Sequence, residues 1–159
     1  MSNALPGRPR QMVQQRRSFA VVASRFNHQY VQGLVDSAKK EVATLAPGAM
    51  VTMYEVPGAF EIPLLVQEVA ARGEVDAIMA LGVIIQGETA HAGLVAQAVT
   101  DALMRLGLHY KLPIIHGVLL VGDANQAQAR CFGTELNRGV EAARAAVRMS
   151  QVVGDLKSR

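Results

Sequence analysis

The fold is decided by residues 77–91, which read AIMALGVIIQGETAH. Their first part, Ala77 to Ile85, is a nearly continuous apolar run of strand length, a pattern typical of a central parallel strand that helices cover on both faces. Glycine, an acid and a hydroxyl group follow, and a helical pattern begins beside His91. Because α/β proteins bind ligands at the carboxyl ends of parallel strands, this junction is a candidate functional site.

A second junction of the same kind lies at residues 56–63, which read VPGAFEIP. Pro57 keeps Val56 extended, because a proline clashes with a helical conformation of the residue before it. Pro63 suits the first turn of a following helix, where its missing N–H costs little. Glu61 places a carboxylate at the start of that helix, so the two junctions together predict one shared site.

Strands and helices alternate along the rest of the chain. The four predicted strands are Ser18 to Ser24, Met50 to Val56, Ala77 to Ile85 and Ile114 to Val121. Apolar residues recur at helical spacing between them, and we expect the helix near His91 to be capped by Thr89 and to end at Gly107. The alternation predicts a three-layer α/β/α sandwich with a four-stranded, mainly parallel sheet and flavodoxin-like layering.

Length and composition predict one domain, residues 18–159, after a flexible N-terminal arm, residues 1–17. Hydrophobic residues make up 50% and charged residues 18% of the 159, which supports an ordinary buried core. Four arginines of the arm account for the net charge of +3, because the remaining chain carries 12 basic and 13 acidic side chains. A nucleic-acid groove needs a basic face across the folded domain, so we expect no nucleic-acid partner.

Cys131 is the only cysteine, which excludes an internal disulfide and a thiolate zinc site. No stretch approaches the length of a membrane span, and we expect a soluble, cytoplasmic protein that binds no membrane. Metal binding is not expected either, because Glu88 and His91 lack a third ligand at suitable spacing.

Strand-to-helix loops of a parallel sheet open at one edge, so residues 25–27, 58–61 and 86–91 should converge. Residues 87–89 could bind a phosphate or carboxylate through backbone N–H groups, or simply form a capped helix start. His91 could transfer protons near neutral pH or be a structural histidine.

Three further residue types leave two interpretations each. Phe26 could stack on a heteroaromatic ring or pack in the core. Glu61 could accept hydrogen bonds from a substrate or simply favour the positive end of its helix. Arg130 and Arg138 could each hold a phosphate through two parallel hydrogen bonds, or lie on solvated helix faces.

The ordered set of residues 25–27 (RFN), 56–63, 82–91 and Arg130 closely resembles lumazine synthase, the penultimate enzyme of riboflavin biosynthesis. The most specific part is VPGAFEIP followed at this separation by a G-x-T-x-H loop. The resemblance implies a transferase that condenses 5-amino-6-ribitylamino-uracil with 3,4-dihydroxy-2-butanone 4-phosphate, eliminating phosphate and water. The product is 6,7-dimethyl-8-ribityllumazine, and the resemblance implies no metal or organic cofactor.

The resemblance also implies roles for individual residues. It places the uracil substrate and its ribityl chain against Phe26, Gly58, Ala59, Glu61, Val83, Ile84, Ile85, His116 and Arg138. It places the phosphate against Gly87, Glu88, Thr89 and Arg130. His91 is implied to assist proton transfer, and Phe26 is implied to stack on the pyrimidine.

Enzymes of this family assemble as pentamers with the active site between neighbours, which implies that a neighbouring subunit donates His116 and Arg130. The turn at residues 133–139 is shorter than the one associated with icosahedral shells, so we expect a pentamer or a dimer of pentamers. His116 replaces an aromatic residue of the family, and residues 92–94 replace an aromatic residue and an acid after His91. These departures leave a second interpretation, a lumazine-binding or flavin-binding protein with reduced or lost catalysis.

A flavodoxin-like nucleotide binder is a third interpretation. Such a protein needs Ser, Thr and Gly in its first loop to cradle a phosphate, and residues 25–28 supply none of them.

Overall fold

The computed structural model describes residues 4–10 and 16–159. Its centre is a four-stranded sheet in the order β2-β1-β3-β4. The strands are β1 (Ser18–Ser24), β2 (Met50–Val56), β3 (Ala77–Ile85) and β4 (Ile114–Val121). All four predicted strands are confirmed at both ends, and every pairing between neighbours is parallel.

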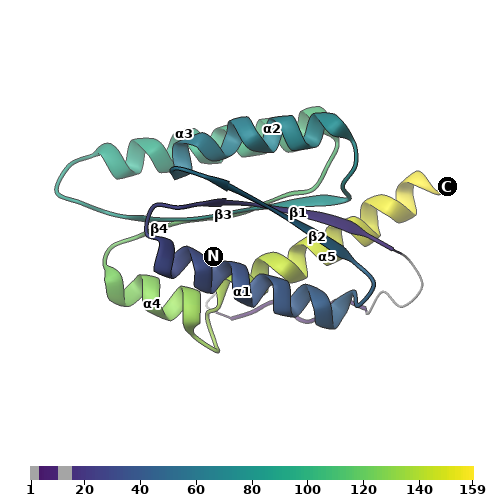
Figure 1. Ribbon diagram of the computed structural model, residues 1–159, viewed down its shortest axis with the longest axis horizontal. Helices are drawn as coiled ribbons and strands as arrows, with labels where there is room; N and C mark the ends of the chain where they lie inside the picture. Colours follow the sequence, from purple (N-terminus) through teal and green to yellow (C-terminus); the bar gives the residue numbers. More distant parts are fainter. Residues whose placement is uncertain (1–3, 11–15) are drawn as a thin grey trace.

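Helices cover both faces of the sheet and form the three predicted layers (Figure 1). One face carries α1 (His28–Leu45), α4 (Ala124–Phe132) and α5 (Arg138–Lys157). The other carries α2 (Ile62–Arg72) and α3 (His91–Tyr110), and a short 3₁₀ turn, η1 (Ala59–Glu61), leads into α2. The loops at the carboxyl ends of the strands therefore open at one edge of the sandwich.

Two hydrophobic cores, one on each face, hold the layers together. Along β1, Phe19 and Val21 pack toward α1 while Ala20 and Val22 pack toward α2. All four side chains are fully buried, because successive strand residues point to opposite faces and both faces are covered. This double coverage is the physical reason for the uninterrupted apolar runs of β1 and β3.

The ends of α3 differ from the prediction. The helix begins at His91 and its capping position is Ala90, one residue after the predicted Thr89. The Thr89 hydroxyl still accepts a hydrogen bond from the backbone N of His91 at 3.4 Å. The helix also continues past Gly107 to Tyr110, where Lys111 takes the left-handed conformation. Packing of the last turn against the core under α3 outweighs the cost of a helical glycine, about 1 kcal/mol.

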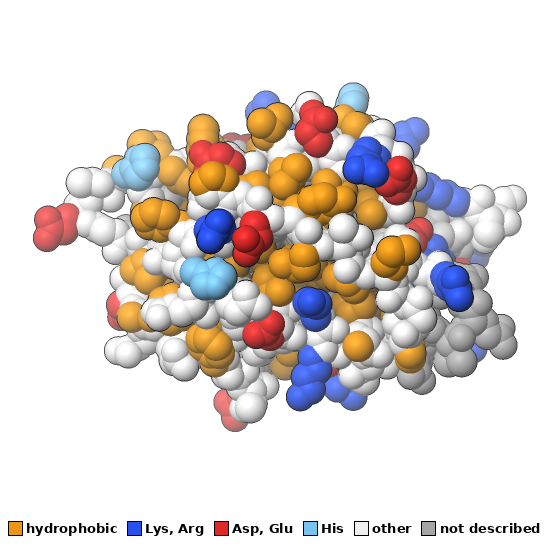
Figure 2. All heavy atoms as spheres, viewed as in Figure 1, with side chains coloured by type: hydrophobic (Ala, Val, Ile, Leu, Met, Phe, Trp, Pro, Cys, Tyr) orange, Lys and Arg blue, Asp and Glu red, His pale blue; other side chains and the backbone are white. Residues whose placement is uncertain are grey.

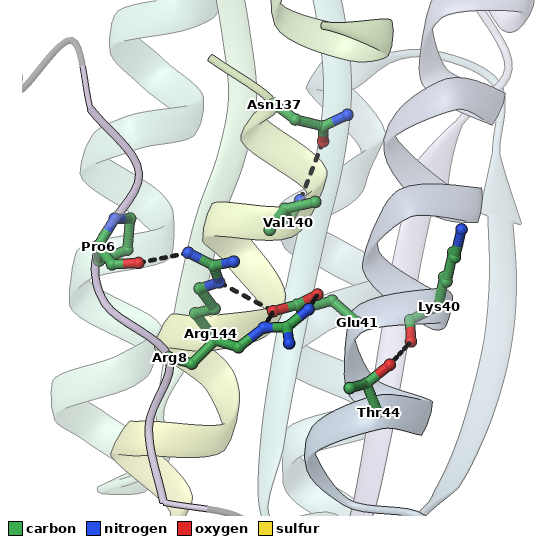
Figure 3. A network of polar contacts seen from close by, with 8 residues as sticks. All are labelled: Pro6, Arg8, Lys40, Glu41, Thr44, Asn137, Val140 and Arg144. Carbon is green, nitrogen blue, oxygen red and sulfur yellow. Dashed lines mark hydrogen bonds and ion pairs between the residues drawn. The ribbon is translucent and has the colours of Figure 1, made fainter. Parts of the chain in front are cut away.

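An ion-pair network around one buried carboxylate joins α1, α5 and part of the predicted N-terminal arm (Figure 3). Glu41 on α1 is 6% exposed and accepts hydrogen bonds from Nε of Arg144 at 2.9 Å and Nε of Arg8 at 3.0 Å. Arg144 also donates to the carbonyl of Pro6, so residues 4–10 lie along α5. Residues 1–3 and 11–15 of that arm lie outside the described residues.

The network changes the titration of Glu41. Burial by itself raises the pKa of the carboxyl, but the hydrogen bonds and positive charges of Arg8 and Arg144 lower it further than burial raises it. The pKa in the folded protein is therefore below its ordinary value of 4.5. Such a group contributes stability above its unfolded pKa, and this contribution disappears as the pH falls through the folded pKa.

We predict that Glu41→Gln lowers the free energy of unfolding at pH 7 by about 2 kcal/mol, since it removes the charge shared by two arginines. Urea denaturation from pH 7 to pH 3 measures this loss, and the gap between the variant and the natural sequence should narrow below pH 4.5. Glu68→Gln, at an exposed position on α2, is the matched control. An equal loss at pH 7 and pH 3 would show that the charge is not responsible.

Candidate active site

A cavity of about 320 Å³ lies where the first three strand-to-helix junctions meet. Eight residues predicted for the site line it: Phe26, Gly58, Ala59, Glu61, Val83, Ile84, Ile85 and His91. Phe60, Asn27 and the first turns of α3 complete the lining. The loops at residues 25–27 and 58–61 meet at this cavity as predicted, but of the third loop, residues 86–91, only His91 lines it.

Hydrogen bonds from the loop after β1 hold the three junctions together. Backbone N of Arg25 donates to the carbonyl of Val56 at 2.8 Å, and N of Phe26 donates to the carbonyl of Pro57 at 3.0 Å. On the other side, Nδ2 of Asn27 donates to the carbonyl of Val83 at 2.7 Å. The first loop is therefore fixed to both of its neighbours.

Asn27 has this role because of its backbone. It takes the left-handed conformation with φ 56° and ψ 42° directly before α1, a conformation that asparagine tolerates better than most residues. Its amide makes no cap to the helix and is directed to β3 instead. We did not predict this residue for the site, although an asparagine directly before a helical pattern is a recognisable signal of a special backbone position.

Phe26 lies beside the cavity with 74% of its surface exposed. Core packing, one of the two interpretations offered above, is therefore wrong for this ring. A large exposed aromatic ring next to a cavity is suited to stacking on a flat ligand.

Glu61 has a structural task that neither interpretation anticipated. Its Oε2 accepts a hydrogen bond from backbone N of Gly58 at 2.9 Å, and its own N donates to the carbonyl of Gly58. This reciprocal pair forms a capping box around η1. Its second carboxylate oxygen makes no hydrogen bond with a described residue and remains available to a ligand.

His91 is the first residue of α3. Its exposed ring lines the cavity but makes no hydrogen bond with any described residue. The adjoining residues 88 and 89 are exposed, and within the described chain the N–H groups of residues 87–89 donate to no acceptor. Free N–H groups before a helix are suited to an anion.

Three of the remaining predicted residues line a different cavity, of about 500 Å³, along the outer edge of β4, whereas residues 87–89 line neither cavity. His116, Arg130 and Arg138 lie there, together with Thr100 and Glu141. Neither cavity shares a lining residue with the other. Within one chain Arg130 thus lines a different cavity from His91, which directly follows the loop that the resemblance groups with Arg130.

The charged groups of this second cavity differ in their partners. Arg138 is 8% exposed and forms an ion pair with Glu141, three residues later on α5. Arg130, at the end of α4, forms no ion pair with a described residue and is the better placed of the two to meet an anion. We did not predict Glu141 for the site, although its spacing from Arg138 is that of an ion pair on a helix.

His116 forms a hydrogen bond through Nε2 with the hydroxyl of Thr100 at 2.8 Å. Burial lowers the pKa of the His116 imidazole, and the residue's own backbone group opposes this only in part. A lowered pKa favours the neutral form of the ring.

Two structural classes find no support among residues 4–10 and 16–159. None of the helices there has the length and apolar character needed to cross a membrane. The same residues contain no group of three or more His, Cys, Asp or Glu side chains placed to hold a metal ion.

Comparison with known proteins connects this geometry to one family. A family model described as 6,7-dimethyl-8-ribityllumazine synthase matches residues 16–153. A protein of that name from Polaromonas sp. is 38% identical over 140 residues, which cover 87% of this chain and 88% of the relative. Proteins of the same name from Burkholderia vietnamiensis and Burkholderia cenocepacia are each 42% identical over 133 residues, or 83% of this chain and 76% and 75% of theirs.

We predict that Asn27→Ala destabilises the fold more than Asn27→Gly does. Both changes remove the amide that reaches Val83, but only alanine is also strained by about 1 kcal/mol in the left-handed conformation. Urea denaturation of the two variants measures the difference. Equal losses would mean that the backbone conformation contributes nothing to holding the loop.

Proposed function

The chain belongs to the 6,7-dimethyl-8-ribityllumazine synthase family, and from this membership we propose that it condenses 5-amino-6-ribitylamino-uracil with 3,4-dihydroxy-2-butanone 4-phosphate in riboflavin biosynthesis. The protein is an enzyme of the transferase class. The observation that carries the proposal is the single cavity lined by eight of the predicted site residues, in a chain that matches the family over residues 16–153.

The lining suits the chemistry of the two substrates. The exposed ring of Phe26 and the apolar end of β3 offer a flat, dry surface to a pyrimidine, and the second carboxylate oxygen of Glu61 can accept hydrogen bonds from ribityl hydroxyls. The free N–H groups of residues 87–89 and the positive end of α3 suit the phosphate of the second substrate.

His91 lies between these two regions, at the junction of the loop and α3. The 5-amino group of the uracil attacks the ketone carbonyl and a first water leaves. Phosphate is then eliminated, and the ribitylamino nitrogen closes the second ring with loss of a second water. Protons must move in each of these steps, and imidazole is the side chain best suited to carry them near neutral pH. We therefore assign proton transfer to His91.

A complete site requires a second subunit in this proposal. His116, Arg130 and Arg138 line the cavity at the β4 edge, so they reach a substrate in the first cavity only from a neighbouring copy of the chain. Exposed apolar side chains support such packing, among them Leu64, Leu94, Met104 and Leu108, each at least 65% exposed. Figure 2 shows apolar side chains gathered across the middle of the face in view, between the two helix layers. A pentamer or a dimer of pentamers is the assembly that we propose.

The decisive experiment gives both substrates to the purified protein and follows formation of the lumazine chromophore by absorbance. Steady production of the lumazine supports the proposed function. An assembled sample that binds the lumazine product tightly but consumes no substrate would reject the enzyme and favour a binding protein that has lost catalysis.

We predict that His91→Ala slows turnover by about 10²-fold to 10⁴-fold, the range typical of a lost general acid or base. The dependence of kcat on pH should flatten at the same time. His109→Ala, at the far end of α3, is the matched control and should retain the rate of the natural sequence. An unchanged rate and pH profile in His91→Ala would remove His91 from the mechanism.

We predict that Arg130→Ala raises KM for the butanone phosphate by about tenfold to 100-fold, because a charge-assisted hydrogen bond to the phosphate is lost. KM for the uracil should change much less. Arg130→Lys keeps the positive charge but lacks the planar guanidinium, so its KM for the butanone phosphate should lie between those of Arg130→Ala and the natural sequence. Equal weakening of both substrates would contradict the assigned role.

A further inference from the structure

The hydrogen bond between Thr100 and His116 joins α3 to the edge strand β4, and the other bond of the Thr100 hydroxyl determines which side chain is the donor. The Thr100 hydroxyl has one proton, which it donates to the carbonyl of Ala96 at 2.8 Å. Its oxygen also lies 2.8 Å from Nε2 of His116. Because the proton of the hydroxyl is already used, Nε2 of His116 must carry a hydrogen and donate it to Thr100.

This arrangement fixes the tautomer of the ring. A neutral imidazole with hydrogen on Nε2 leaves Nδ1 as an acceptor, and no described residue donates a hydrogen bond to Nδ1. Thr100 is itself well held, because its hydroxyl is bound to the preceding turn of α3 and its branched side chain has few rotamers. The ring of His116 is thus attached to a rigid support.

The charges that share the cavity agree with a neutral ring. Arg130 on α4 and Arg138 on α5 are positive, and Glu141 on α5 is the only carboxylate among the lining residues. On α3 the lining residue is the uncharged Thr100, and on β3 the residue paired with His116 is Ala80. A third positive charge, on His116, would therefore be disfavoured by its surroundings as well as by partial burial.

The two substrates differ in charge and shape, and each suits a different residue of this cavity. The anionic butanone phosphate suits Arg130, which has no carboxylate partner among the described residues. A planar uracil suits the neutral imidazole, which offers a flat face and one acceptor nitrogen. His116 therefore serves the uracil.

We propose, building on the proposed function, that Thr100 is a positioning residue: it holds His116 in one orientation and one tautomer, as the wall that a neighbouring subunit adds to the uracil site. Thr100 itself touches no substrate in this proposal. Its effect on the enzyme passes entirely through the imidazole of His116.

A double-mutant cycle tests this dependence. Thr100→Val keeps the shape of the side chain but removes the acceptor, and it should raise KM for the uracil about threefold to tenfold, the effect of one lost hydrogen bond. KM for the butanone phosphate and kcat should stay within twofold. Thr100→Ser retains the oxygen and should restore the KM for the uracil.

The cycle is completed in a His116→Phe background, where no hydrogen bond to residue 100 can form. There Thr100→Val should change KM for the uracil by less than twofold. The same increase in both backgrounds would assign the effect to packing of α3 and overturn the proposal. No increase in the natural background would overturn it as well.

A second readout needs no turnover. In protein labelled with ¹⁵N-histidine, the His116 signals are identified by their loss in His116→Phe, and the nitrogen shifts at pH 7 should show hydrogen on Nε2. Thr100→Val should shift the ring toward a mixture of tautomers and weaken equilibrium binding of 6,7-dimethyl-8-ribityllumazine, measured by its fluorescence. A ring with hydrogen on Nδ1 in the natural sequence overturns the proposal.

The two readouts separate the proposal from the function on which it rests. A protein that binds the lumazine with the predicted dependence on Thr100 but forms none from the substrates would disprove the enzyme and support the role of Thr100. A protein that forms the lumazine at a normal rate, but whose His116 tautomer or KM for the uracil does not depend on Thr100, would support the enzyme and disprove the role of Thr100.

Discussion

The candidate site depends on the hydrogen bonds by which the first loop extends the pairing of β1 beyond its last residue. On one side the backbone of residues 25 and 26 continues the register with β2, and on the other side the amide of Asn27 reaches β3. These contacts bring the aromatic ring of the first loop, the carboxylate of the second and the imidazole of the third to one cavity. A parallel sheet supplies the common edge, but the contacts of this loop determine how closely the three junctions approach.

Sequence patterns predicted the strands better than the helix ends. Pro57 stops β2 by a local steric effect, and the continuous apolar run of β3 reflects cover on both faces, so both can be recognised without the fold. The end of α3 depends on which residues pack under its last turn, and Gly107 was therefore a misleading signal. Local steric effects and hydrophobic patterns can be recognised in a sequence, whereas the balance between helix propensity and tertiary packing cannot.

The same distinction holds for the site. The loops that line the first cavity could be predicted because each follows a strand, and the strands were correct. The links from Asn27 to Val83 and from Thr100 to His116 could not, because they join residues 56 and 16 positions apart. The capping bond from Gly58 to Glu61 spans only three residues. A carboxylate at this position is, however, equally expected for ligand binding, so the sequence did not distinguish the two roles. In the structure one oxygen of the Glu61 carboxylate accepts the capping bond, which leaves the other for the ligand-binding role that we propose.

The core under α1, α4 and α5 contains the one cysteine of the chain. Cys131 is fully buried on α4, and burial raises the pKa of its thiol to about 11, although the charge of Arg130 acts in the opposite direction. The thiolate is the form that reacts with electrophiles, so the folded chain keeps its single thiol unreactive. The rate at which a thiol-directed dye labels Cys131 would consequently report how often α4 separates from the sheet.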